Sequence, residues 1–459
     1  MQIEKRLLIK SLDTVRRFIS KESVSPIWST VLIDGERQKI IAQNREGRAE
    51  IDLEIHDSYK QIDVPNEPEF PDEFFFGELM ELHQVQLRNL CDDYGIPYRS
   101  NPTPIEMVRE VWKASMIGAD EEGTTKSMWI HEKFAINPIK LRKIVSSLDY
   151  RDDDLVDLHL EDYEANNVID NEMQPYKIRI GENFSELPVF ASNEFPSPVY
   201  LDSPLLLEKV AEFAGKELQH LCNASEDRSD LPFKEIILFD RDHDTVVSCD
   251  QKRVHTINKP MIGSEPIKIM THIVRNLARE GKKVLMRFDE LADVAVFETG
   301  NLSVFCEHVH QQFPKYRNKL NASFQHSVTT EAIMLEKIIK QSLILTGKHY
   351  RAVNLSFNDG QLSVKLKNPS AGNYVNENID VTGGTVSPPE SFKVDALWIL
   401  HALFPKSGLT SWVDISFDCG GKTIKFDQGD CSSLVVVCNV MTGKIIKSNL
   451  HCHASRVEQ

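Results

Sequence analysis

Two clusters of histidine and cysteine contain the residue types that bind transition metals. Cys306, His308 and His310 alternate along one segment, and His451, Cys452 and His453 are adjacent near the C-terminus. Neither cluster has a second ligand pair at the spacing of a zinc site, and an alternating His-x-His on a strand places both rings on one side. The sequence also contains no GxGxxG loop, no P-loop and no GxSxG elbow. We therefore expect no metal site, no cofactor and no catalytic residues, and a protein that is not an enzyme.

Carboxylates are frequent in the segment DYRDDDLVDLHLEDYE, where they could suggest a magnesium site. Their alternation with apolar residues is more typical of a strand with a solvated acidic face. The eight cysteines include no CxxC pair, which argues against a disulfide framework or a zinc ribbon and favours buried thiols. No stretch approaches about 18 consecutive apolar residues, and the first residues have no signal-peptide pattern, so we expect a cytoplasmic protein with no membrane partner.

A long, degenerate repeat organises the 459 residues. Three copies of a unit begin with an amphipathic segment, continue into alternating strands with a turn between them, and then reach a second amphipathic segment. The predicted helices cover 5–21, 137–149, 204–220, 266–283, 331–348 and 393–406. Two helices laid against antiparallel strands in each copy define an α+β fold class.

The spacing of the copies locates an insertion. Pro204 to Pro266 and Glu331 to Lys393 are both 62 residues, whereas the first copy has about 68 residues more. We expect three similar domains at 1–198, 199–320 and 321–445, a tail at 446–459, and the insertion at about 57–133 in the first domain. The insertion reads as a helical pair with a faint likeness to SAP-type modules, so DNA binding, protein contact and passive elaboration all stay open.

Positive charge is concentrated in the predicted helices. They carry about +12, which leaves about −28 for the rest of a chain whose formal net charge is −16. This separation is typical of a protein with one basic surface on an acidic body, although solvated helix faces alone often carry Lys and Arg. The candidate phosphate-binding residues are Arg16, Arg17, Lys21, Lys140, Arg142, Lys143, Lys209, Lys268, Arg275 and Arg279.

The repeat resembles that of the bacterial sliding clamp, the beta subunit of DNA polymerase III. The resemblance rests on LEKIIKQSLILTGKHYRAVNLSFNDGQLSVKLKNPSAG and FKVDALWILHALF in the third copy, on DQKRVH and QQFPKYRNKL in the second, and on LPVFASNEFP at the end of the first. It covers nearly the whole chain apart from the insertion and the tail. The resemblance implies a head-to-tail homodimer that closes a ring around double-stranded DNA without reading its sequence.

The resemblance also implies two kinds of protein contact. The dimer interface would include Ile344 and Leu345 on one side and Phe184 and Leu187 on the other, with ordinary core residues as the alternative. A cleft between the second and third domains would bind short peptides of the clamp loader and DNA polymerase. By position, its residues are Asp250, Lys252, Arg253, Val254, Pro314, Tyr316, Arg317, Thr423, Val437, Cys438, Asn439 and Val440.

Several departures from the family pattern set this chain apart. Gln251 and Lys252 replace Gly and His, and VVVCNV replaces a methionine-containing end, which removes the most adaptable residue of a promiscuous surface. We therefore expect a divergent clamp with specialised partners. The alternative is a clamp-shaped accessory or structural protein that no longer loads onto DNA.

Overall fold

The computed structural model describes residues 1–19, 29–64, 126–160, 176–180, 185–196, 205–225, 232–346, 351–368, 373–382, 390–403 and 412–436, apart from 45, 57, 58, 132, 152, 192–194, 282, 359, 419 and 420. The described residues within Met1–Asp13, Thr30–Ile41 and Asp52–Phe195 form one compact unit. Those within Thr14–Ser29, Ala42–Ile51 and Pro196–Gln459 form a second. None of the described helices is long and apolar enough to cross a membrane.

Antiparallel strands and two helices build the first unit. The strands follow one another in the order β1 (Gln2–Glu4), β8 (Leu155–Leu160), β9 (Tyr176–Ile180), β10 (Ser185–Ala191), β7 (Lys133–Ile136), β2 (Val31–Asp34) and β3 (Lys39–Gln43). The helices are α1 (Lys5–Val15) and α5 (Pro138–Ser147). Asn137 caps α5 by accepting from the amides of Ile139 and Lys140, and Pro138 occupies the first turn, where no amide hydrogen is needed.

A buried lysine joins the two helices of the first unit. Lys5 is buried, and its Nζ donates to the carbonyl oxygens of Leu148 at 2.9 Å and Tyr150 at 2.8 Å. These carbonyls follow the last turn of α5, where backbone oxygens have no partner within the helix. The start of α1 is therefore fixed to the end of α5.

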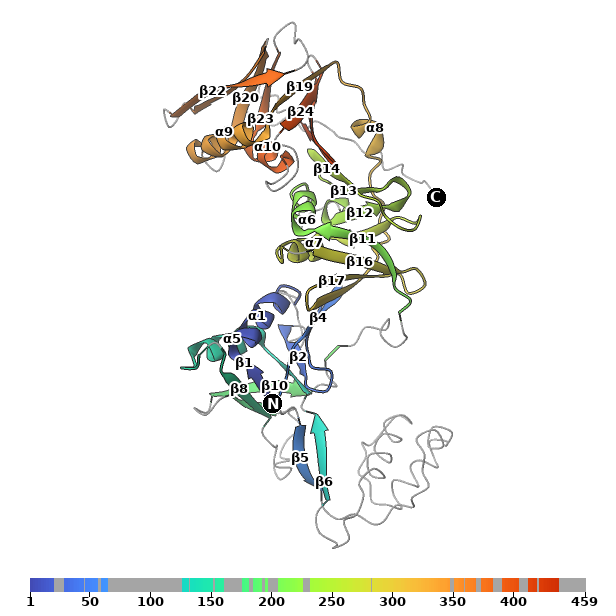
Figure 1. Ribbon diagram of the computed structural model, residues 1–459, viewed down its shortest axis with the longest axis vertical. Helices are drawn as coiled ribbons and strands as arrows, with labels where there is room; N and C mark the ends of the chain where they lie inside the picture. Colours follow the sequence, from blue (N-terminus) through green and yellow to red (C-terminus); the bar gives the residue numbers. More distant parts are fainter. Residues whose placement is uncertain are drawn as a thin grey trace. The chain divides into compact units, whose positions relative to one another are not determined.

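A separate two-stranded ribbon carries the insertion. Strand β5 (Tyr59–Val64) pairs antiparallel with β6 (Lys126–His131), from Tyr59 opposite His131 to Val64 opposite Lys126. The sequence between these strands, including the helical pair expected there, lies outside the described residues. The insertion thus enters and leaves the first unit through one hairpin (Figure 1).

The second unit contains two extended antiparallel sheets. One has the order β4 (Gly47–Asp52), β18 (Leu302–Glu307), β17 (Val294–Thr299), β16 (Lys283–Asp289) and β11 (Glu208–Ala214). The other has the order β15 (Ile267–Met270), β12 (Ile236–Asp240), β13 (Thr245–Cys249), β14 (Arg253–Asn258), β26 (Cys431–Val436), β25 (Thr423–Gln428), β24 (Trp412–Phe417), β19 (His326–Glu331), β22 (Asn373–Thr382), β21 (Gln361–Asn368), β20 (Ala352–Asn358) and β23 (Glu390–Asp395).

Four helices accompany these sheets in two pairs. Helix α6 (Gly215–Cys222) packs against α7 (Thr271–Ala278), and α9 (Ala332–Leu345) packs against α10 (Ala396–Ala402) (Figure 1). Gly215 allows the first pair to approach closely, because a Cβ there would lie 3.0 Å from the carbonyl oxygen of Ala278. A short helix, α8 (Arg317–Leu320), lies in the segment that connects β18 to β19, and the 3-10 turns Pro232–Glu235 and Arg241–His243 flank β12.

The predicted helix boundaries were wrong where a strand precedes the helix. Residues 208–214 and 267–270 form β11 and β15, and residues 331 and 393–395 end β19 and β23. Strand β11 pairs with β16 along its length, with a bulge between Lys209 and Ala211. The pairing of these strands in a large sheet outweighs the helix propensity of Leu, Glu, Lys and Ala in 204–214.

Aromatic side chains fill the core of the third repeat. The rings of Phe357, Phe392 and Phe417 contact one another at centroid distances of 4.4 to 6.0 Å. All three are buried, together with Leu335 and Ile339 of α9 and Ile399 of α10. The helix pair therefore covers the inner face of this sheet, as the repeat predicts.

Candidate functional site

Carboxylates are scarce on the helices of both units. Only three carboxylates, Asp13, Glu217 and Glu336, lie on the helices α1, α5, α6, α7, α9 and α10. Each of these is bonded to a cation: Asp13 to Arg142 at 2.6 Å, Glu217 to Lys259 at 3.1 Å and Glu336 to Lys340 at 2.5 Å. The described helices therefore present an excess of positive charge, as a surface for phosphates requires.

The candidate phosphate-binding residues fall into two groups. Lys140, Lys143, Arg16 and Arg279 are exposed on or directly after helices. Arg142 and Arg17 instead form ion pairs, with Asp13 and with Glu280, and the hydrogen bond to Asp13 raises the pKa of Arg142.

Three further candidates are held by their own unit or lie on strands. Arg275 donates from Nη2 to the carbonyl oxygen of Cys222, the last residue of α6, at 2.9 Å. Lys209 and Lys268 lie on β11 and β15 and not on helices, which corrects their expected position. Burial lowers the pKa of Lys268, whose Nζ donates to the carbonyl oxygen of Gln311. Lys21 lies outside the described residues.

Sequence reasoning left other exposed helical cations out of the candidate set. Arg6 and Lys10 are exposed one turn apart on α1, Lys216 is exposed at the start of α6, and Lys337 is exposed on α9. These residues were included in the charge count of the predicted helices. They become candidate phosphate contacts only when the structure shows which face of each helix is exposed.

A small apolar cluster lies apart from the large cores, and we call it the Tyr316 surface. Its buried members are Leu238, Val247, Cys249, Val254, Tyr316 and Leu434, and half-buried Phe233, Phe313, Leu320 and Phe324 pack against them. The Tyr316 hydroxyl donates to Asp240 at 2.7 Å, and Arg317 donates to the same carboxylate oxygen at 2.7 Å. Burial, followed by this hydrogen bond, raises the pKa of Tyr316. The cluster contains the expected cleft residues Val254 and Tyr316, and the expected Arg317 is bonded beside them to Asp240.

A tight turn between β13 and β14 holds the next cleft candidates. One Asp250 oxygen accepts from the amides of Lys252 at 2.6 Å and Arg253 at 2.7 Å. The other accepts from both Nε and Nη2 of Arg253, at 3.0 and 2.7 Å, so a single carboxylate oxygen receives two charge-assisted hydrogen bonds in a largely buried salt bridge. The backbone oxygen of Lys252 accepts from the amide of Val436, the last residue of β26. The turn therefore fixes the strand that leads into residues 437–440, which lie outside the described residues.

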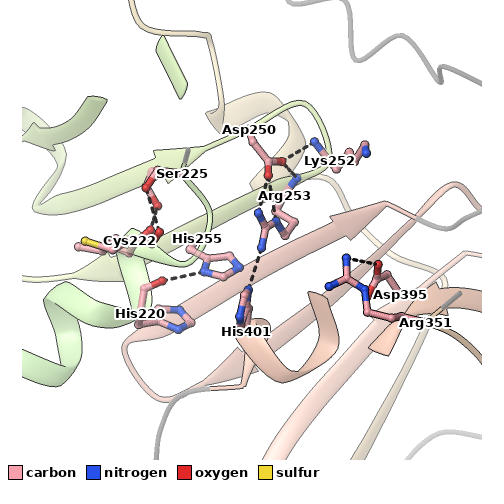
Figure 2. Close-up of polar contacts among 12 residues, drawn as sticks. His220, Cys222, Ser225, Asp250, Lys252, Arg253, His255, Arg351, Asp395 and His401 are labelled. Carbon is pink, nitrogen blue, oxygen red and sulfur yellow. Dashed lines mark hydrogen bonds and ion pairs between the residues drawn. The ribbon is translucent and has the colours of Figure 1, made fainter. Parts of the chain in front are cut away.

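Arg253 also reaches across to the third repeat. Its Nη1 donates to Nδ1 of His401 on α10 at 2.9 Å (Figure 2). Because a guanidinium can only donate, Nδ1 of His401 is the unprotonated nitrogen. Burial and the neighbouring Arg253 charge lower the pKa of His401 to about 4.

Two further histidines lie buried next to this contact. His220 of α6 and His255 of β14 stack with ring centroids 4.6 Å apart. His255 donates from Nδ1 to the carbonyl oxygen of His220 at 2.9 Å, and Ser433 of β26 lies 3.3 Å from Nε2 of His220. Burial lowers the pKa of His220 to about 3 and lowers that of His255 well below its usual range. The junction of β14, β26, α6 and α10 thus depends on neutral imidazoles (Figure 2).

The remaining expected contacts are dispersed. Pro314 is half-buried beside the Tyr316 surface, and Thr423 is half-buried on β25, opposite Val436 of β26. Ile344 at the end of α9 is 81% exposed, and Leu345 packs against the core of the third repeat. Leu187 is buried on β10, and Phe184 lies outside the described residues.

The possible metal ligands Cys306, His308 and His310 lie in different surroundings. Cys306 is buried on β18 with its thiol bonded to the Ala295 carbonyl oxygen, and burial raises its pKa. His308 and His310 stack on one another and contact Asp293 at 3.4 and 3.0 Å. Within the described part of the chain, no group of three or more His, Cys, Asp or Glu could hold a metal ion. His451, Cys452 and His453 lie outside it. The four cysteines that the structure describes, Cys222, Cys249, Cys306 and Cys431, are buried free thiols, as expected.

Comparison with solved structures identifies the fold as that of the sliding clamps. A putative DNA polymerase III beta subunit of Eubacterium rectale aligns with 95% of this chain and 99% of its own, at a TM-score of 0.64 and 12% identity. A Pseudomonas aeruginosa sliding clamp bound to griselimycin aligns with 95% of this chain and 98% of its own, at a TM-score of 0.64 and 16% identity. A Helicobacter pylori beta clamp bound to a DNA ligase peptide aligns with 95% of this chain and 99% of its own, at a TM-score of 0.63 and 15% identity.

The chain therefore has the fold of the DNA polymerase III beta subunit, at 12–16% sequence identity to these three solved structures. The α+β architecture expected from the repeat is confirmed. No protein-family model and no curated protein sequence matches the chain.

Proposed function

We propose that this protein is a DNA sliding clamp, a non-enzymatic cytoplasmic processivity factor. Its three clamp domains would span 1–198, 199–320 and 321–445. The observation that carries the proposal is the charge of the described helices within this fold, whose three carboxylates are each bonded to a cation. Contacts from such helices to phosphates are independent of sequence, so a closed ring can slide.

Strand pairing within the chain supports a head-to-tail homodimer. Successive repeats are joined by antiparallel pairs, β4 with β18 and β14 with β26. Among the described residues, Ser185–Pro188 of β10 pair only with β9, and Asn373–Asp380 of β22 pair only with β21. We propose that β10 of one copy pairs with β22 of another, because backbone groups at an open edge are a template for pairing. Leu187 lies on β10, and Ile344 lies in the last turn of α9, which packs against β22.

The decisive experiment measures topological retention on DNA. Sedimentation should give twice the 52.4 kDa chain mass, and protein assembled on a nicked circular plasmid should be lost when the plasmid is linearised. Lys140, Lys143, Arg279 and Lys337 changed together to Glu should abolish retention, while Lys365→Glu with Lys422→Glu, at exposed positions off the helices, should not. Unchanged retention in the fourfold variant, or a strict monomer, would refute the ring mechanism.

A clamp-shaped accessory protein that does not load onto DNA is the second candidate. The observation that favours it is the engagement of Arg17, Arg142 and Arg275 in contacts within their own units. These contacts leave fewer helical cations for phosphates than the sequence suggests. A ring of the expected mass with no retention on circular DNA, and no stimulation of a polymerase, would select this candidate.

For partners, we propose that the Tyr316 surface receives short peptides from a clamp loader and a DNA polymerase. Support comes from its half-buried aromatic rim and from neighbours that hold griselimycin or a DNA ligase peptide. Griselimycin and that ligase peptide are therefore the first probes. Calorimetric binding that is lost in Phe313→Ala with Phe324→Ala, but kept in Lys365→Glu, is the expected result, and absence of binding to either probe would count against this surface.

A further inference from the structure

The charge around the Tyr316 surface is unusual for so acidic a chain. Lys252 and Lys315 are exposed and Lys319 is half-buried, and none has a carboxylate partner within the described part of the chain. Two carboxylates at this surface are already occupied: Asp250 by Arg253, and Asp240 by Arg317 and Tyr316. A chain of formal charge −16 thus leaves uncompensated positive charge here.

Lys252 is the most firmly placed of these lysines. Its backbone is fixed by Asp250 on one side and by Val436 on the other. Its Nζ lies 5.1 Å from the ring centroid of Trp398 on α10. An aromatic ring attracts the ammonium through its quadrupole without neutralising it, so Lys252 is oriented and still carries a full charge.

From this geometry we propose that the peptide bound at the Tyr316 surface is acidic, with a carboxylate next to its apolar anchor residues, and that Lys252 receives that carboxylate. The inference rests on the proposed peptide-binding function and names the chemistry of the partner. Half-buried Phe313, Leu320 and Phe324 would take the apolar anchors. This apolar rim favours a peptide over a DNA phosphate backbone, which offers charge without apolar side chains.

The test uses the full-length protein and a randomised dodecapeptide phage library. Enriched sequences should carry Asp or Glu within two residues of a large apolar residue. Selection against Lys252→Glu should lose that preference, whereas selection against the matched control Lys365→Glu, at an exposed lysine on β21, should keep it.

A double-mutant cycle makes the assignment specific. With the best selected peptide labelled with fluorescein, Lys252→Gln should weaken anisotropy-measured affinity about fivefold, as for a partly exposed ion pair. The same substitution should leave unchanged the affinity of the peptide whose carboxylate is replaced by the amide. Circular dichroism confirms that the variant is folded.

Each other outcome overturns a defined part of the reasoning. Enriched peptides that are neutral or basic, or a cycle without coupling, would overturn the acidic-peptide inference and leave the peptide-binding function standing. No enrichment at all would overturn the peptide-binding function itself. If Lys252→Gln leaves peptide affinity intact and instead weakens binding of a labelled DNA duplex, Lys252 is a phosphate contact and the inference is wrong.

Discussion

Lowering the pH from 7 to 5 should loosen the junction that contains His220, His255 and His401. His220 and His255 are buried and His401 is half-buried in the folded chain. Burial lowers the pKa of His220 to about 3 and that of His401 to about 4, so both imidazoles are neutral at pH 7. The unfolded chain has the ordinary histidine pKa of about 6.5. Below pH 6.5 the unfolded state therefore binds more protons, so stability falls with falling pH until the folded pKa is reached.

The size of the effect follows from the two pKa values. For His401, a change from about 6.5 unfolded to about 4 folded costs about 2 kcal/mol between pH 7 and pH 5. His220 contributes a similar loss of about 2 kcal/mol over the same interval. His255 acts in the same direction, since burial lowers its pKa as well.

Hydrogen–deuterium exchange of the β14 and β26 amides measures this loss where it occurs. After correction for the intrinsic exchange rate, the opening free energy should fall between pH 7 and pH 5. His401→Asn keeps an acceptor for Arg253 without a titrating group. The opening free energy of this variant should therefore fall by about 2 kcal/mol less than that of the parent between pH 7 and pH 5. The exposed His310, changed to Gln, is the matched control and should behave as the parent. Equal pH dependence in His401→Asn and the parent would refute the reasoning.

Four further outcomes are expected from the contacts described. Ile344→Glu, which places a charge at a side chain that is 81% exposed, should halve the sedimented mass without changing the melting temperature. Lys5→Met leaves two carbonyl oxygens at the end of α5 without their donor and should cost about 2–3 kcal/mol in urea unfolding. Gly215→Ala should cost about 1–2 kcal/mol in urea unfolding, because its Cβ meets backbone at 3.0 Å. Replacing 65–125 with an Asn-Gly turn should leave the exchange protection of the second unit unchanged, because β5 and β6 already pair to their ends; loss of protection there would show that the insertion has a structural role.

The repeat arithmetic predicted the fold because helix pairs and alternating strands recur at a fixed spacing. It could not find the starts of α6 and α7, because the residues before them pair as strands with partners far along the chain. For the site, the family resemblance assigned Asp250, Arg253, Val254, Tyr316 and Arg317 to one cleft. The structure adds the bonds of Arg253 to Asp250 and of Arg317 to Asp240.

The histidine junction could not have been predicted. His220, His255 and His401 are far apart in the sequence, and an isolated histidine gives no sign of whether it is buried. Similarly, the pairing of Arg17 with Glu280 and of Arg142 with Asp13 depends on where side chains meet in space. Charge counts over predicted helices therefore overestimate the cations that remain available.

If β10 of one copy pairs with β22 of the next, as proposed above, each added copy presents the same two edges again, and nothing in the pairing itself stops growth. Closure after two copies would then be set by other parts of the chain. A substitution that disturbs closure and leaves both edges competent would convert the proposed dimer into larger rings or open filaments.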